Sequence, residues 1–366
     1  MLESLKNSPV KFGIAIGAIV LINVVGWFAY FTWQNPLGEP LDVPTATVVP
    51  ATATEVVQTA APSDTPQPGE TAAPTGTPEP TFTPTIEPVC GGPPTMTVLV
   101  AGVASDGYLF GLADAVRLVR IDFQQQKVDV LALPRDMWVN IPGVADHGVE
   151  EGKLNQAYFY GTEGMGFYDG PGYGSGLLAH TLQQNFGVHV DHYLAVNHHG
   201  FRNIIDAIGG VEVCFSEPVY TKWFGEPKLF KKAGCHTLTG KEAEKVVRAR
   251  IEIGDFGRIQ RQTHVLRAIA AKMLTPSGIR NMPDFVNRLR NYVETDLSPQ
   301  QGSQLICLAE KISPSEDIHY HVISQDLLSE ERIMDEFQGY QVYALTYDQD
   351  QIRQIITEFQ NGTLSE

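Results

Sequence analysis

Four arginines gather within fourteen residues of an otherwise acidic chain, at Arg248, Arg250, Arg258 and Arg261. Lysine and arginine total 26 against 42 aspartates and glutamates, and the formal net charge is −16. The planar guanidinium group binds two phosphate oxygens at once and tolerates partial burial. One hypothesis for the cluster is therefore a phosphate-binding site. The other is a surface helix whose arginines pair with neighbouring acids, an arrangement that adds little stability.

The spacing of the later residues favours a helix. If a helix begins at Asp255, whose carboxylate can cap a helix start, Arg258, Arg261 and Gln262 follow at intervals of three and four residues. Residues at these intervals share one helix face. The arginines would then point in one direction from a single rigid element.

Another arginine follows a strand-like segment at 127–133, in the sequence Pro134-Arg135-Asp136. Binding sites in open α/β sheets lie beyond the carboxyl ends of strands, so Arg135 is a candidate phosphate ligand, although an Arg and an Asp can also simply pair in a turn. Lys153 and Asn155 precede an aromatic stretch and could add a cation and an amide to the site. They could equally belong to a loop that packs its aromatic side chains on the core.

Two aspartates, Asp106 and Asp114, flank a glycine-containing loop after the first predicted strand. Mg²⁺ is usually held by one or two carboxylates together with substrate phosphates. A metal site beside the arginines is one interpretation of this loop, and turn formation by the aspartates is the other.

The N-terminal part indicates a membrane protein. Residues 12–33 are almost wholly apolar and long enough to cross a bilayer. Lys6 and Lys11 precede this segment and the first later charges are acidic, which places residues 1–11 in the cytoplasm and the rest of the chain outside. A cleaved signal peptide is the alternative. Residues 34–92 are rich in Pro, Thr and Ala, and we expect a disordered linker there.

The four cysteines lie on the predicted outer side, where disulfides form. Cys214 and Cys235 lie at the two ends of a short segment and are expected to pair with each other. Cys90 would then pair with Cys307 and join the end of the linker to a late part of the domain.

Apolar strand-like segments alternate with helical ones after residue 93, which predicts one layered α/β/α domain at 93–360 with a central mixed sheet. The predicted strands lie at 96–103, 115–123, 127–133, 192–196, 211–215 and 320–323. The predicted helices lie at 176–186, 200–208, 241–248, 258–274, 283–292, 299–312 and 348–359.

The order of these motifs resembles the LytR-CpsA-Psr family of bacterial envelope proteins. The motifs PRD, KLN, GFRNIIDAIGGV and RAR followed by DFGRIQRQ occur in sequence between about residues 95 and 275. The resemblance implies a phosphotransferase that moves a glycopolymer from a polyprenyl-pyrophosphate carrier to peptidoglycan at the cell membrane. It implies no nucleic-acid partner. Hydrolysis of the same carrier, and non-catalytic binding of the lipid carrier or wall polymer, are the alternative functions.

The resemblance also assigns roles to residues. Asp255, Arg248 and Arg250 would be catalytic, with Asp255 as the base, and Asp114 with Asp106 would hold Mg²⁺. Alanine at Arg248 or Arg258 would abolish transfer and leave the fold intact. Two positions depart from the family pattern, because Leu112 and Ala104 stand where an Arg and an Asp are usual. The resemblance implies that the pyrophosphate is held by Arg135, Arg248, Arg250, Arg258, Arg261 and Gln262, and we add Lys153 and Asn155 as candidate ligands.

Overall fold

The computed structural model describes residues 32–42, 86–223, 226–250, 254–289 and 292–365. The predicted membrane-spanning segment lies outside these ranges except for its last two residues, as does the linker at 43–85. Within the described ranges, no helix combines the length and the apolar character that a membrane crossing requires. The two described ends of the linker contact the folded part. The Leu37 amide donates to the carbonyl of Leu297 (3.3 Å), and the Val89 amide to that of Phe123 (2.9 Å).

A six-stranded mixed sheet forms the centre of the molecule, as predicted, in the order β11-β6-β1-β2-β3-β12. β1, β2 and β3 are antiparallel neighbours, whereas β6 runs parallel to β1 and β12 runs parallel to β3. β11 closes one edge in the antiparallel sense. The strands are β1 (Thr95–Val103), β2 (Ala113–Asp122), β3 (Lys127–Leu133), β6 (His192–Asn197), β11 (Val293–Thr295) and β12 (Ile318–Val322).

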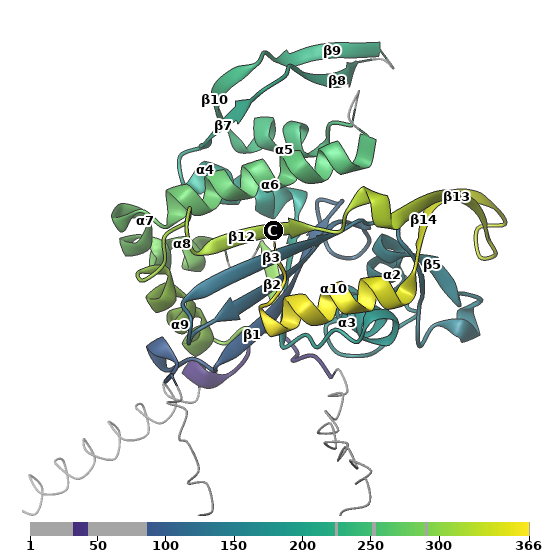
Figure 1. Cartoon of the computed structure of the whole chain (residues 1–366), viewed down its shortest axis with the longest axis horizontal. Helices are drawn as coiled ribbons and strands as arrows, with labels where there is room; N and C mark the ends of the chain where they lie inside the picture. Colours follow the sequence, from purple (N-terminus) through teal and green to yellow (C-terminus); the bar gives the residue numbers. More distant parts are fainter. Residues whose placement is uncertain (1–31, 43–85, 224–225, 251–253, 290–291, 366) are drawn as a thin grey trace, which may run out of the picture.

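Both faces of the sheet are apolar, because the alternating side chains of its strands are buried on each side. On one face, Leu99 and Leu118 pack with α3 (Tyr173–Phe186) and α10 (Gln349–Asn361). On the other face, Val98 and its neighbours pack with α9 (Pro299–Ala309). Figure 1 shows these helices on opposite sides of the sheet. The central sheet is thus the rigid support from which the loops at its strand ends project.

A smaller apolar cluster lies at the side of the sheet, where helices pack on a two-stranded sheet of β7 and β10. The side chains of Ile205, Val246 and Val265 are fully buried there. In Figure 1 a second hairpin, β8–β9, extends from this region at the top of the molecule. The elements are α4 (His198–Ala207), β7 (Val211–Phe215), β8 (Val219–Trp223), β9 (Glu226–Lys231), β10 (Gly234–Leu238), α5 (Gly240–Arg248) and α6 (Gly254–Met273).

The remaining elements are short helices and strands outside the six-stranded sheet. Among them, β13 and β14 form a long antiparallel hairpin before α10. The full set of these remaining elements is η1 (Val89–Gly91), β4 (Trp138–Asn140), η2 (Ala145–His147), β5 (Glu151–Lys153), α2 (Leu154–Tyr160), α7 (Pro276–Arg280), α8 (Met282–Leu289), η3 (Gln325–Leu327), β13 (Leu328–Asp335) and β14 (Tyr340–Tyr347).

The structure corrects three sequence-based expectations. The aromatic stretch after Lys153 is the helix α2 and not a loop, and the side chain of Gln156 accepts the backbone amide of Lys153 at the start of this helix (2.6 Å). Helix α6 begins at Gly254, one turn before the start of the predicted range 258–274, so Asp255 lies in its first turn. The hairpins β8–β9 and β13–β14 were not predicted.

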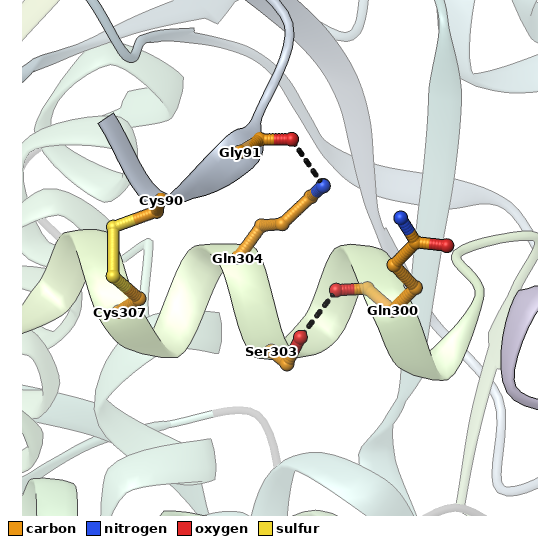
Figure 2. The surroundings of a disulfide bond; sticks show 6 residues. All are labelled: Cys90, Gly91, Gln300, Ser303, Gln304 and Cys307. Atoms are coloured by element: carbon orange, nitrogen blue, oxygen red, sulfur yellow. Dashed lines mark hydrogen bonds between the residues drawn. A yellow bond between two sulfur atoms is a disulfide. The ribbon is translucent and has the colours of Figure 1, made fainter. Parts of the chain in front are cut away.

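Both disulfides form with the predicted partners. Cys214 and Cys235 face each other across β7 and β10. Cys90 and Cys307 are 217 positions apart in sequence and join the segment before β1 to α9. Figure 2 shows this bond beside the hydrogen bond from the Gln304 side chain to the carbonyl of Gly91 (2.7 Å). The late helix α9 is therefore fixed to the point where the chain enters the sheet.

The two disulfides differ in the length of chain that they close, 217 against 21 residues. Because a longer loop loses more conformational entropy when it is closed, we expect the double change Cys90→Ser/Cys307→Ser to lower the free energy of unfolding by about 2 kcal/mol more than Cys214→Ser/Cys235→Ser does. Urea unfolding of the two variants and of the parent, followed by tryptophan fluorescence, measures the difference. Equal losses, or a larger loss in the 214–235 variant, would contradict this expectation.

Candidate functional site

Arg135 lies at the centre of a group of carboxylates just beyond the end of β3. Its guanidinium forms an ion pair with Asp114, and its Nε lies 3.4 Å from a carboxylate oxygen of Asp136 and 3.4 Å from one of Asp255. Burial alone would lower the pKa of Arg135, but the charges of Asp114, Asp136 and Asp255 outweigh it and raise that pKa above its usual value. The PRD turn therefore projects a permanently charged fork into the site, as the position of Arg135 after a strand predicted.

Helix α6 supplies the second arginine of the site from its first turns. Arg258 is only 1% exposed, and its Nη2 lies 2.8 Å from Asp255 Oδ1, one helical turn earlier. Its Nη1 is 3.9 Å from Asp114 Oδ2. Burial and the neighbouring charge of Arg135 lower the pKa of Arg258 to about 10, against the opposing charge of Asp255. Arg258 and Arg135 thus share the carboxylates Asp114 and Asp255.

The arginines at the end of α5 are more open to solvent. Arg250 is 46% exposed, and its Nη2 lies 3.6 Å from Asp114 Oδ2, which brings it to the same carboxylate as Arg135 and Arg258. Arg248 is 58% exposed and pairs with Glu244 at 2.7 Å, one turn earlier on α5. The structure therefore places Arg250 in the central cluster and Arg248 beside it, at the outer edge.

The other two predicted residues of α6 support the site from behind. Arg261 Nη1 donates to the carbonyl of Ala249 (3.4 Å), the residue between Arg248 and Arg250. Gln262 Oε1 accepts a hydrogen bond from Arg117 Nη2 (3.2 Å). These contacts orient the RAR segment and connect α6 to β2.

Arg117 is a buried arginine of the site that the motif analysis did not include. It is 3% exposed on β2, and its Nη2 also lies 3.5 Å from the carbonyl of Ile259 on α6. Burial first, and then the charge of Arg258, lower the pKa of Arg117 to about 10. The sequence feature that could have identified Arg117 is an arginine between the apolar residues Val116 and Leu118 of a strand, because charged side chains are rarely buried without a specific reason.

A pocket of about 470 Å³ opens beside the arginine cluster. Lys153, the last residue of β5, lines this pocket with its Nζ 2.9 Å from Asp136 Oδ1 and 5.9 Å from the centre of the Tyr343 ring on the C-terminal hairpin. Sequence reasoning found one wall of this pocket and missed the wall that η3 and the hairpin β13–β14 supply. The lining residues are Arg135, Asp136, Lys153, Arg250, Gly254, Asp255, Phe256, Gln325, Glu330 and Tyr343.

Comparison with known proteins decides the family. The model of the LytR_cpsA_psr family matches residues 86–361, which include the whole sheet and every residue of the site. The chain belongs to this family.

Its similarity to known members of the LytR_cpsA_psr family is moderate. It is 33% identical over 213 residues to the polyisoprenyl-teichoic acid–peptidoglycan teichoic acid transferase TagU of Oceanobacillus iheyensis, covering 58% of this chain and 62% of that protein. It is 31% identical over 192 residues to the regulatory protein MsrR of Staphylococcus aureus, covering 52% of each. The match thus spans less than two thirds of the length of these relatives.

Solved structures show the same fold. The crystal structure of B. subtilis TagV superposes with a TM-score of 0.58 at 23% sequence identity, and the match covers 73% of this chain and 97% of TagV. The structure of B. subtilis TagT gives a TM-score of 0.53 at 23% identity, covering 76% and 97%. The mixed sheet flanked by helices is therefore the fold of this family.

Two predicted site residues of this family member lie away from the central cluster. Asp106 pairs with Arg202 Nη2 (2.7 Å), and Nη1 of the same arginine binds Glu244, the partner of Arg248. The hydrogen bond from Arg202 lowers the pKa of Asp106, against the opposing effect of desolvation. Asn155 is buried, and its backbone amide donates to the carbonyl of Arg135 (3.0 Å). Asn155 thus positions the PRD turn, and Asp106 joins an outer chain of ion pairs.

The carboxylates at the centre suit a hard divalent cation. Asp114 and Asp255 both contact Arg135, so the two carboxylates already share one cation. Mg²⁺ commonly takes one or two carboxylates and completes its shell with substrate phosphates and water. In the part of the chain that the structure describes, no group of three or more His, Cys, Asp or Glu is arranged to hold a metal. A cation at this position would need further oxygen ligands from a phosphorylated substrate or from water.

Proposed function

We propose that the chain transfers a glycosyl phosphate from a polyprenyl-pyrophosphate-linked glycopolymer to peptidoglycan. The observation that carries this proposal is the convergence of Arg135, Arg250 and Arg258 on Asp114 at the edge of an open pocket. Fixed guanidinium groups beside an open cavity are suited to binding a pyrophosphate and to stabilising the charge that develops during phosphoryl transfer. The name of the TagU relative describes the same class of reaction for that protein.

The arginines in this mechanism bind and neutralise the pyrophosphate. Arg250 and Arg135 line the pocket and would contact the substrate directly, whereas Arg258 is buried and holds Asp255 and Asp114 in place. The exposed Arg248 would bind an outer oxygen after leaving Glu244. Arg261 and Gln262 position these groups through Ala249 and Arg117.

The transfer step forms one bond and breaks another. The oxygen of an acceptor sugar hydroxyl attacks the phosphorus attached to the glycopolymer, and the bond from that phosphorus to the bridging oxygen breaks. Polyprenyl phosphate leaves with the electron pair of that bond. We assign Asp255 as the group that takes the proton of the hydroxyl, because its carboxylate lines the pocket beside Arg135 and Arg250.

Asp114 would hold Mg²⁺ in the presence of substrate, whose phosphate oxygens would complete the shell of the cation. When bound, Mg²⁺ supplies further positive charge to the pyrophosphate oxygens. Asp106 remains part of the proposed metal-binding loop only if its pair with Arg202 opens, since that pair occupies its carboxylate in this structure. We also propose that residues 12–33 anchor the chain in the cell membrane with the domain outside.

Product analysis with the purified full chain tests the proposal. Polyprenyl-pyrophosphate-linked glycan is incubated with Mg²⁺, with and without peptidoglycan, and release of polyprenyl phosphate is measured. We expect release that requires peptidoglycan and that falls on chelation of Mg²⁺ or in Asp255→Asn. Equal release of lipid and free glycan phosphate without peptidoglycan would indicate hydrolysis, and binding of the carrier without turnover would indicate a binding protein.

A further inference from the structure

A cluster of aromatic rings lies at the tip of the hairpin β13–β14, outside the residues that the proposed reaction uses. The ring centre of Phe337, at this tip, lies 5.4 Å from that of Tyr160 and 5.9 Å from that of Phe167. Phe167 in turn stacks on His147, with the ring centres 4.3 Å apart and an angle of 4° between the ring planes. The hairpin tip, α2 with the turn that follows it, and η2 thus each contribute a ring to one cluster.

Part of the cluster faces solvent. Phe337 is 42% exposed and Tyr340 is 56% exposed, whereas Tyr160 is buried. The hydroxyl of Tyr340 donates to the side-chain oxygen of Gln338, the residue after Phe337. Hairpin turns are usually built from small or polar residues, and a group of neighbouring exposed apolar side chains commonly marks a binding surface. We call Tyr160, Phe167, Phe337 and Tyr340 the aromatic platform.

Hydrogen bonds fix the hairpin tip that carries the platform. The buried carboxylate of Asp335 accepts the backbone amide of Gln338 (2.9 Å) and the side-chain amides of Gln338 (2.8 Å) and Gln156 (3.2 Å). Gly339 has a φ of 74°, which glycine adopts readily, and its amide donates to the carbonyl of Asp335 (2.7 Å). Rings held in this way lose little conformational entropy when they bind a ligand.

Two elements lead from the aromatic platform to the pocket. Tyr160 is the last residue of α2, and Lys153, which lines the pocket, immediately precedes this helix. Tyr343 of β14 also lines the pocket, three residues after Tyr340. With a rise of about 1.5 Å per residue in a helix and about 3.4 Å in a strand, both elements place the platform about 10 Å from the pocket. Figure 1 shows α2 and β5 next to this hairpin.

The charge near the aromatic platform disfavours an anionic ligand. Residues 326–340 include five acidic residues and one arginine, Arg332, and Asp146 precedes His147 of the ring cluster. The face of an aromatic ring carries partial negative charge and attracts the polarised C–H groups of a sugar ring. The exposed amide of Gln338 can both donate to and accept from sugar hydroxyls. An uncharged sugar chain therefore fits the platform better than a phosphorylated polymer does.

We propose that the aromatic platform binds the uncharged sugar backbone of the acceptor glycan and directs its hydroxyl into the pocket. Phe337 and Tyr340 stack on the sugar rings, and Tyr160 and Phe167 hold Phe337 in place. This site rests on the proposed transfer reaction and adds to it a separate binding site for the acceptor. The donor pyrophosphate is held by the arginines, and the acceptor reaches the same pocket from the side of the hairpin.

Binding of a sugar oligomer by the full chain in detergent tests the platform without requiring turnover. The probe is chitohexaose, an uncharged oligomer of N-acetylglucosamine without a lipid, and titration calorimetry measures its binding. We expect Phe337→Leu/Tyr340→Leu, which keeps apolar side chains but removes both rings, to weaken binding by about tenfold. Leu229→Ala/Val286→Ala removes exposed apolar surface on other elements and should leave binding unchanged.

The transfer assay gives a second readout for the same leucine variant. Because the platform binds the acceptor and touches no reacting atom, the KM for peptidoglycan should rise by about tenfold, while kcat and the KM for the lipid-linked donor stay unchanged. A purely structural role would lower kcat or change both KM values. Either of those results would contradict the assignment of the platform to the acceptor.

The outcomes separate the platform from the transfer reaction. Failure of the parent chain to bind chitohexaose, or equal losses in the two double variants, would overturn the platform. So would unchanged chitohexaose binding in a leucine variant that has lost self-association, since the rings would then bind a second copy of the chain. If chitohexaose binds through the rings and no transfer is detected, the proposed reaction fails and the sugar site stands. Transfer with an unchanged KM for peptidoglycan in the leucine variant would leave the reaction and remove the platform.

Discussion

Replacing Arg135 by alanine is expected to lower the rate of glycosyl-phosphate transfer by about a hundredfold to a thousandfold, the usual loss when one fixed charge-stabilising group is removed from an active site. Arg135 contacts Asp114, Asp136 and Asp255 at once. Without it, Asp114, Asp136 and Asp255 lose the cation that they share beside the pocket, so a pyrophosphate meets repulsion where it now meets a guanidinium. The measurement is release of polyprenyl phosphate in the presence of peptidoglycan.

Two further variants serve as controls for Arg135→Ala. Arg135→Lys keeps the charge but not the planar fork, and we expect activity between those of the parent and of Arg135→Ala. Arg280→Ala removes an exposed arginine from α7 and should retain full activity. A rate for Arg135→Ala within tenfold of the parent, in protein with an unchanged thermal unfolding midpoint, would remove Arg135 from the mechanism.

Replacing Arg258 by methionine is expected to affect stability as well as activity. The side chain is 1% exposed and lies 2.8 Å from Asp255. Removing one partner of a buried ion pair typically costs about 3–5 kcal/mol, because the other charge stays buried without compensation. From the sequence we expected that loss of Arg258 would leave the fold intact. Because the side chain is buried, we now expect its loss to destabilise the fold.

Arg250 provides the matched comparison, since it contacts the same carboxylate, Asp114, from an exposed position. Arg250→Met should change the free energy of unfolding by less than about 1 kcal/mol, as exposed ion pairs contribute little. It should nevertheless reduce transfer, because Arg250 lines the pocket. Urea unfolding and the transfer assay together test the pair. Similar stability losses in the two variants would show that burial does not distinguish their roles.

The parts of the site that the sequence predicted are those with a local signal. Arg258, Asp255 and Gln262 share a helix, and their spacing alone brings them to one side of α6. Arg135 follows directly from the end of β3, where the chain must leave the sheet. The disulfide partners were also correct, because Cys214 and Cys235 are close in sequence and only one pair then remains.

The parts that the sequence did not predict depend on long-range packing. Tyr343 and Glu330 reach the pocket because the hairpin β13–β14 folds back on α2, almost two hundred residues earlier in the chain. Arg117 lies on β2, where successive side chains point to opposite faces of the sheet. It neighbours Arg258 only because α6 packs over β2. Short sequence motifs contain no information on these two packing arrangements, so neither could be predicted from the sequence.

The position of one phosphorus atom tests the proposed reaction most directly. A polyprenyl-pyrophosphate-linked glycan is labelled with ³²P in the phosphate attached to the sugar and incubated with the full chain, Mg²⁺ and peptidoglycan. Transfer of a glycosyl phosphate predicts that the label becomes covalently bound to peptidoglycan, while unlabelled polyprenyl phosphate is released. Label that remains on the lipid as polyprenyl pyrophosphate, with glycan attached to peptidoglycan, would contradict attack at phosphorus and with it the role of the arginine cluster.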